Sequence, residues 1–147
     1  MLRKVEEDLV RLIKEGALLK EEIENKGKQN HDEMKHLLLN ILEVADDFDR
    51  KFLHINQKIQ DADSQTKIWI NNFKSTRKLL ISVIRDMGVV EIETIGMKAV
   101  PGYHVTMEVV KREGMEEEII VEELKKGYFW RNETLRKAEV ITVKNNN

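Results

Sequence analysis

Hydrophobic positions recur every three or four residues along the first sixty residues of the chain. One series is Leu2, Val5, Leu9, Leu12, Leu19 and Ile23, with Gly16 in the same phase. A second series is Met34, Leu38, Ile41, Ala45, Phe48, Phe52, Ile55 and Ile59. The step of eleven residues from Ile23 to Met34 returns to nearly the same face of a straight helix. The pattern therefore predicts one long coiled-coil helix over residues 1–60.

The polar link at residues 24–30 is the weakest part of this predicted helix. It contains Gly27, and a glycine inside a helix costs about 1 kcal/mol relative to alanine. A break at this link, which would give two helices, is therefore an open alternative.

A third apolar stripe follows a polar turn at residues 61–66, where Asp63 or Ser64 is the expected helix N-cap. The stripe consists of Trp69, Phe73, Thr76, Leu80, Val83 and Met87. It predicts a second bundle helix over residues 64–87, ended by Gly88. The short connection makes the two helices antiparallel, so two chains would form a four-helix bundle. The expected dimer interface comprises Leu38, Ile41, Ala45, Phe48, Phe52, Phe73 and Leu80.

After Gly88 the pattern changes to short runs rich in β-branched and aromatic residues. They occupy residues 89–92, 105–110, 118–121, 128–130 and 135–143. The runs predict a small C-terminal β-domain over residues 89–143, followed by a flexible tail at 144–147. A domain this small is marginally stable alone, so we expect the bundle to brace it. The predicted fold class is α+β: a long coiled-coil helix, an antiparallel helical hairpin that forms a four-helix bundle in a homodimer, and an all-β domain.

Composition narrows the possible functions. Charged residues make up 35% of the 147 residues and aromatic residues 5%, which is typical of long solvated helices. The net charge of -2 disfavours nucleic acid and anionic membranes as partners. The absence of cysteine excludes disulfides and thiolate catalysis and fits a cytoplasmic location. We find no catalytic motif and no metal-ligand spacing, so we expect a protein that is not an enzyme and needs no cofactor or metal.

Three groups of residues invite a chemical reading. His104 is expected to make structural hydrogen bonds rather than bind a metal, because the other histidines are scattered. Asp46, Asp47 and Asp49 predict a solvated acidic face rather than a cation site, since only Asp46 and Asp49 share a helical face. Trp69 and Trp130 are expected to be packing residues, although Phe129 and Trp130 beside Arg131 could instead form an exposed anchor for a partner.

Several segments resemble the GrpE family, in the family's order along almost the whole chain. Residues 42–50 are similar to a family run that ends in D-N-L-E-R, residues 88–92 to G-V-E-x-I, and residues 96–104 to G-x-x-F-D-P-x-x-H. The most specific resemblance is K-G-Y followed by L-R-x-A-x-V, carried by residues 126–128 and 135–140. The matching signature positions are Gly88, Gly96, His104, Gly127, Tyr128, Leu135, Arg136 and Ala138.

This resemblance implies a homodimeric co-chaperone. Such a protein binds the nucleotide-binding domain of a DnaK-type chaperone and promotes ADP release, in protein folding and the heat-stress response. Family members usually carry a disordered acidic segment before the long helix, whereas this chain begins in the heptads. We therefore expect any client-binding role of that segment to be missing. The alternative is a dimeric coiled-coil scaffold or prefoldin-like holdase without exchange activity.

The resemblance also implies a set of chaperone-binding residues: Arg50, Asp46, Asp49, Asn72, Pro101, Glu133 and Thr142. Arg50 is expected to be a charged contact, and an ion pair between Asp46 and Arg50 is the alternative reading of that segment. Asn72, Glu133 and Thr142 depart from the glycine, arginine and apolar residue that are usual in the family.

Overall fold

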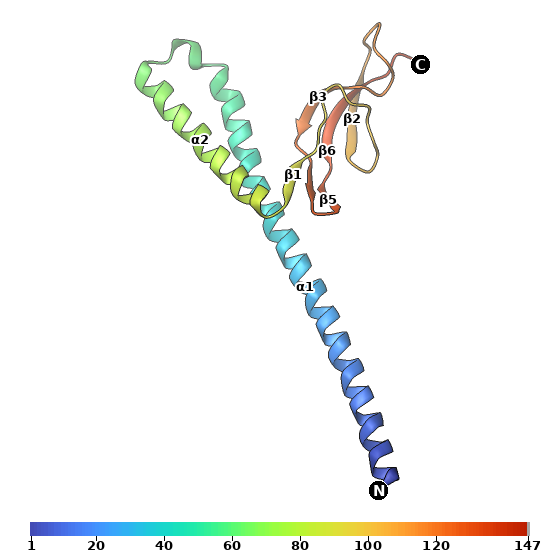
Figure 1. Ribbon diagram of the computed structural model, residues 1–147. Helices are drawn as coiled ribbons and strands as arrows, with labels where there is room; N and C mark the ends of the chain where they lie inside the picture. Colours follow the sequence, from blue (N-terminus) through green and yellow to red (C-terminus); the bar gives the residue numbers. More distant parts are fainter. Residues whose placement is uncertain (147) are drawn as a thin grey trace. The chain divides into compact units, whose positions relative to one another are not determined.

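The computed structural model describes residues 1–146, which form two compact units, residues 1–38 and the residues from Leu39 onward (Figure 1). The elements are α1 (Leu2–Asn56), a 3-10 turn (Ile59–Asp61), α2 (Ser64–Asp86), β1 (Val89–Glu91), β2 (His104–Val110), β3 (Ile120–Lys125), β4 (Tyr128–Trp130), β5 (Glu133–Arg136) and β6 (Ala138–Val143). The α+β class predicted from the sequence is confirmed. The four-helix bundle of a homodimer stays a prediction, because a single chain is described.

Helix α1 continues through both of its glycines. The predicted single helix is therefore confirmed, and a break at residues 24–30 is wrong. Side-chain pairs one turn apart flank the glycines: Arg11 with Glu15 before Gly16, and Glu22 with Lys26 and Gln29 with Glu33 on the two sides of Gly27. Each such pair stabilises a helix by a few tenths of a kcal/mol, roughly 0.2–0.5, so several together offset much of a glycine's penalty.

The first apolar stripe of α1 is exposed along its whole length within the chain. Its members Leu2, Val5, Leu9, Leu12, Leu19 and Ile23 each expose more than half of their surface. Apolar side chains repeated along one helical face are favourable when another helix covers them. Within a single chain nothing covers the stripe from Leu2 to Ile23.

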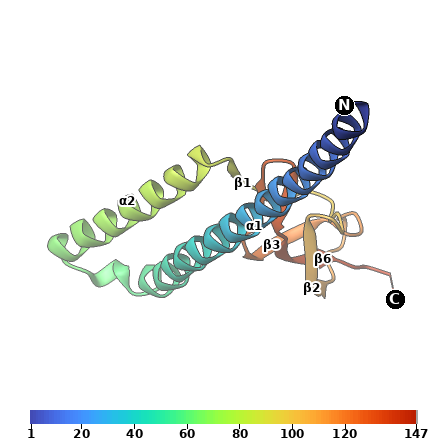
Figure 2. The same ribbon diagram turned by 90° about the horizontal axis from the view of Figure 1, so that it is seen from below.

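The second unit begins with a helical hairpin formed by the end of α1 and by α2 (Figure 2). From the second stripe, Ala45 and Phe52 are buried, and Ile41, Phe48 and Ile55 are half-buried, as expected. On α2 the buried residues are Ile70, Ile81 and Ile84.

Much of the stripe predicted for α2 is left uncovered within one chain. Trp69, Phe73 and Val83 are exposed, and Trp69 shows 58% of its surface. A single chain therefore leaves Trp69 uncovered, and its packing in a two-chain bundle stays a prediction. Two neighbouring faces of α2 are apolar, and periodicity alone does not tell which of them contacts α1.

Asp63 caps α2 as predicted, since its Oδ1 accepts a hydrogen bond of 2.6 Å from the Thr66 backbone N–H. This hydrogen bond lowers the pKa of the Asp63 carboxyl below 3.8. A folded-state pKa below the unfolded one means that the cap stabilises α2 above the unfolded pKa and weakens as pH falls through the folded pKa.

Asp63→Ala is therefore expected to lower the melting temperature at neutral pH, with the difference from the unaltered protein shrinking in strong acid. Thermal melts followed by far-ultraviolet circular dichroism measure this. Asp63→Asn is the control, because asparagine caps well but does not titrate in acid. An equal loss at both pH values would show that the carboxylate is not the cap.

The β-domain consists of two three-stranded sheets, in the orders β1-β4-β5 and β2-β6-β3. Strand β6 lies in the centre of its sheet, parallel to β2 and antiparallel to β3. The run predicted at residues 135–143 covers the last two residues of β5 and all of β6, which Lys137 separates. A core cluster of Ile120, Ala138 and Val140 packs against Ala99.

The segment 144–147, predicted to be flexible, has several hydrogen bonds within its described part. The Lys144 N–H donates to the Val110 carbonyl, and the Asn145 side-chain amide donates to the carbonyls of Arg112 and Met115. The Asn146 N–H donates to Glu117. Asn147 lies outside the described residues.

Candidate functional site

The signature residues of the β-domain are mainly structural. Gly127 packs against the Ala138 backbone so closely that a Cβ atom would lie 2.4 Å from the Ala138 nitrogen. Tyr128, Leu135 and Ala138 are buried. Gly88 and Gly96 have φ angles of 92° and 81°, which favour glycine. These positions therefore fix the shape of the domain.

His104 holds two parts of the loop between β1 and β2 together, as the expected structural role requires. Its Nδ1 accepts a 2.9 Å hydrogen bond from the Val100 backbone N–H, and its Nε2 lies 3.0 Å from the Glu93 carbonyl. Because Nδ1 is an acceptor, the ring proton belongs on Nε2, where it is donated to that carbonyl. Both ring nitrogens are therefore occupied by backbone groups.

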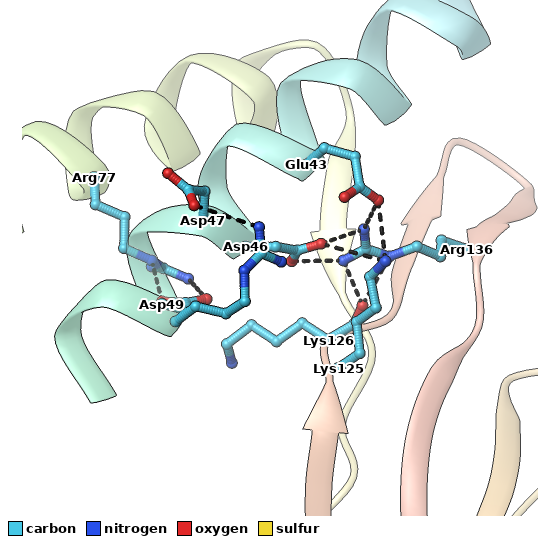
Figure 3. A network of polar contacts seen from close by, with 9 residues as sticks. Glu43, Asp46, Asp47, Asp49, Arg77, Lys125, Lys126 and Arg136 are labelled. Carbon is cyan, nitrogen blue, oxygen red and sulfur yellow. Dashed lines mark hydrogen bonds and ion pairs between the residues drawn. The ribbon is translucent and has the colours of Figure 1, made fainter. Parts of the chain in front are cut away.

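A network of four charged side chains, here called the clasp, joins α1 to the β-domain (Figure 3). The clasp comprises Glu43 and Asp46 from α1, and Lys125 and Arg136 from the β-domain. The Arg136 guanidinium donates two hydrogen bonds to the Asp46 carboxylate, of 2.7 and 2.9 Å. Lys125 lies 3.0 Å from Glu43 and 3.6 Å from Asp46. The side chains of Arg136 and Asp46 are only 14% and 8% exposed, so this bidentate pair is largely shielded from water.

The clasp overturns the prediction of a solvated acidic face. Asp46 is buried and directed at the β-domain, whereas Asp49 forms an ion pair of 2.6 Å with Arg77 of α2. The alternative ion pair between Asp46 and Arg50 is also wrong, because Arg50 pairs with Asp47 at 3.4 Å. The hydrogen bond from Lys51 lowers the pKa of Asp47, which is the aspartate of this segment that pairs along the helix surface. Because α1 contacts both α2 and the β-domain here, Asp49 and Asp46 pair with different elements. The periodicity of the sequence does not reveal which acid faces which element.

A groove of about 380 Å³ lies beside the clasp, between α1 and β3. Its α1 side consists of Asp46, Asp49, Arg50 and Leu53, and its β-domain side of Glu123, Leu124, Lys125, Lys126 and Glu139. Leu53 and Leu124 expose 63% and 49% of their surface. Lys126 is held by Glu91 and Glu123, which raise its pKa against the opposing effect of burial. Exposed apolar side chains with a rim of charges are the usual make-up of a protein-binding surface.

The structure brings three of the seven expected chaperone-binding residues together, since Arg50, Asp46 and Asp49 all line the groove. The other four do not line it. Asn72 is exposed on α2, and Pro101 is exposed in the loop before β2. Glu133 is half-buried at the start of β5, and Thr142 is buried in β6.

Sequence reasoning missed the two leucines of the groove. Leu53 directly follows Phe52 and is out of phase with the stripe, and Leu124 is the apolar residue in the charged segment 122–126. The sequence does contain a signal for Leu124, because a single apolar residue among charged ones in a strand can indicate a contact surface. The signal is weak, because single exposed apolar residues are common on protein surfaces.

The residues expected at a dimer interface divide into two groups. Leu38, Ala45 and Phe52 are already buried within one chain, and Ile41, Phe48 and Leu80 are half-buried. Phe73 is exposed, as are its α2 neighbours Trp69 and Val83. The uncovered face of the hairpin is therefore carried mainly by α2.

Trp130 is a packing residue, and the alternative of an exposed anchor is wrong. It is 1% exposed, and its indole N–H donates a 3.1 Å hydrogen bond to the Met87 carbonyl at the end of α2. Among the described helices, none is long and apolar enough to cross a membrane. Residues 1–146 also contain no cluster of histidine, aspartate and glutamate suited to holding a metal ion.

Comparisons with known proteins agree with the motifs. The family model described as GrpE matches residues 2–144, which covers both helices and the β-domain. The chain is 31% identical over 110 residues to Protein GrpE of Brachyspira hyodysenteriae, covering 75% of this chain and 54% of the relative.

Two further relatives show the range of the match. Protein GrpE of Carboxydothermus hydrogenoformans is 34% identical over 107 residues, which is 73% of this chain and 52% of the relative. Protein GrpE of Chlorobaculum tepidum is 26% identical over 144 residues, which is 97% of this chain and 74% of the relative. The chain thus spans about half the length of the first two relatives, at 54% and 52%. Because the family model extends over nearly all of its residues, the chain belongs to the GrpE family.

Proposed function

We propose that the protein is a homodimeric nucleotide exchange factor, a co-chaperone that binds the nucleotide-binding domain of a DnaK-type chaperone and promotes ADP release. Its place is in protein folding and the heat-stress response in the cytoplasm, and it is not an enzyme. The observation that carries the proposal is the GrpE family match over residues 2–144, which includes each part of the fold.

The exposed stripes support the homodimer. The apolar side chains of residues 2–23 on α1 and the α2 face of Trp69, Phe73 and Val83 are uncovered in a single chain. A second copy would bury both surfaces at once, as in coiled coils and helical bundles. Nearly balanced charge keeps electrostatic repulsion between the copies small.

The groove supports a protein partner. Leu53 and Leu124 would supply the apolar contact, and Arg50 would supply a charged contact at the rim. Asn72, Pro101 and Glu133 lie outside the groove and would contact other parts of the partner. Asp46 and Thr142 are buried, so they would contribute by holding the surface in shape.

The physical mechanism is a shift in population. A chaperone whose nucleotide-binding lobes open and close holds ADP tightly in the closed form. A protein that binds the open form better weakens nucleotide binding by its differential affinity for the two forms. This mechanism makes and breaks no covalent bond.

Stopped-flow release of labelled ADP from the cognate DnaK-type chaperone tests the proposal. Saturating amounts of the protein should accelerate release by at least about tenfold, which corresponds to roughly 1.4 kcal/mol of differential binding. No acceleration at saturation would exclude exchange activity and favour the scaffold or holdase.

Leu124→Ser is expected to raise the protein concentration needed for half-maximal acceleration of ADP release by about tenfold. The reason is the loss of an apolar contact that binding to the chaperone would bury. Met107→Ser is the matched control, because Met107 is a similarly exposed apolar residue on β2 that does not line the groove. Equal effects of the two variants would show that the groove is not the docking site.

A further inference from the structure

Two sets of hydrogen bonds tie the β-domain to the helices. The first lies at the covalent junction, where the Trp130 indole binds the Met87 carbonyl and the Arg131 N–H donates to the Gly88 carbonyl. The second is the clasp, where Arg136 and Lys125 hold the acids of α1. Both junction bonds end on the carbonyls of residues 87 and 88, so they attach the β-domain beside its covalent link to α2. The clasp is a second attachment, at a different place and on the other helix.

Arg136 is held in place from the β-domain side. Its Nε and Nη2 donate to the Lys126 carbonyl at 3.0 and 2.8 Å, and its guanidinium lies over the Tyr128 ring at 5.4 Å. These contacts, all within the β-domain, orient the Arg136 guanidinium toward Asp46 independently of α1. A rigid fork that meets a carboxylate through two hydrogen bonds fixes direction as well as distance.

We infer that the clasp is the element that sets the orientation of the β-domain on the helical hairpin, with Asp46 and Arg136 as its positioning residues. This inference rests on the proposed function in one respect: the orientation would determine how well the protein props open its partner. A β-domain that turns freely still offers its contact residues. Such a β-domain would adopt many orientations, however, and only the molecules in which it has the correct orientation would open the chaperone.

Asp46→Asn tests the inference, because asparagine keeps the shape of the side chain and removes its charge. The Lys126 carbonyl and the Tyr128 ring still hold Arg136, so the β-domain is expected to stay folded, which far-ultraviolet circular dichroism checks. Asp8→Asn is the matched control, since Asp8 forms an exposed ion pair with Arg11 on the same helix. Arg136→Lys is a second variant, which keeps the charge and loses the fork.

The first measurement is the distance between two spin labels. The chain has no cysteine of its own, so the labels are attached at Lys51→Cys on α1 and at Lys111→Cys directly after β2. Mixing with excess unlabelled chain leaves one labelled pair in each dimer. The unaltered protein and Asp8→Asn should give one narrow distance distribution, and Asp46→Asn and Arg136→Lys should give broad ones. A distribution in folded Asp46→Asn as narrow as in the unaltered protein would overturn the inference.

The second measurement is labelled ADP release. Asp46→Asn is expected to lower the maximal acceleration by about tenfold while the half-saturating concentration changes by less than about threefold, because the competent fraction falls while the contacts remain. A broadened distribution with unchanged acceleration would overturn the link between orientation and exchange. If the unaltered protein gave no acceleration, the proposed function and that link would both fail, and the distance distributions would still decide whether the clasp sets the orientation.

Discussion

Gly127→Ala is expected to destabilise the β-domain by about 3 kcal/mol or more, at the upper end of what overpacking a core costs. The added methyl group would lie 2.4 Å from the nitrogen and 2.9 Å from the Cα of Ala138, which are backbone atoms. Side chains escape such contacts by changing rotamer, but a backbone moves only with its strand. Relief would displace the start of β6 and, with it, the pairing of that strand with β2 and β3.

Urea unfolding of a Trp69→Phe protein measures this effect, because Trp130 is then the only tryptophan and reports on the β-domain. Gly102→Ala is the matched control, since a Cβ atom there meets nothing within 4 Å. Its stability should match that of the parent to within about 0.5 kcal/mol. Two equal losses would refute the steric explanation for Gly127.

Trp130→Ala is expected to destabilise the protein by about 3–5 kcal/mol, the usual range for removing a large buried aromatic side chain. Trp130 is 1% exposed, donates to the Met87 carbonyl, and packs under the Arg131 guanidinium at 4.9 Å. Its loss would open a cavity and leave that carbonyl without its donor. Urea unfolding followed by near-ultraviolet circular dichroism measures the change.

Two further variants separate the contributions at this site. Trp130→Phe keeps much of the volume and loses the indole N–H, so a smaller cost of about 1–2 kcal/mol is expected. Trp69→Ala is the contrasting case, because Trp69 is mostly exposed within one chain. It should leave the β-domain unchanged and weaken association between chains. A larger loss of β-domain stability from Trp69→Ala than from Trp130→Ala would contradict the packing described above.

The sequence predicted most of the architecture because each element has its own local signal. The second stripe of α1, the Asp63 cap and the change of period after Gly88 each depend on residues that are close together along the chain. The strand at residues 128–130 coincides with β4. The signature residues Gly127 and Ala138 were recognised from their motif, and the structure gives the steric reason for it.

The parts that the sequence did not predict depend on contacts between distant residues. Asp46 and Arg136 are separated by 90 positions, and no local pattern links them. Asp46 was therefore placed on a solvated face, and the pairing of Arg50 was assigned to the wrong aspartate. Leu53 and Leu124 form one groove only because the β-domain lies beside α1 in the folded unit. The choice of the packed α2 face likewise required the position of its neighbour.

The central position of β6 bears on how the chain acquires its structure during synthesis. Strand β2 pairs in parallel with a strand that is translated last of the six, so neither β2 nor β3 has its neighbour while the ribosome is still making residues 111–137. The helices, which need only local contacts, form well before that time. A nascent chain therefore carries finished helices together with unpaired β2 and β3, whose exposed edges are prone to misassembly until Ala138–Val143 leave the ribosomal tunnel.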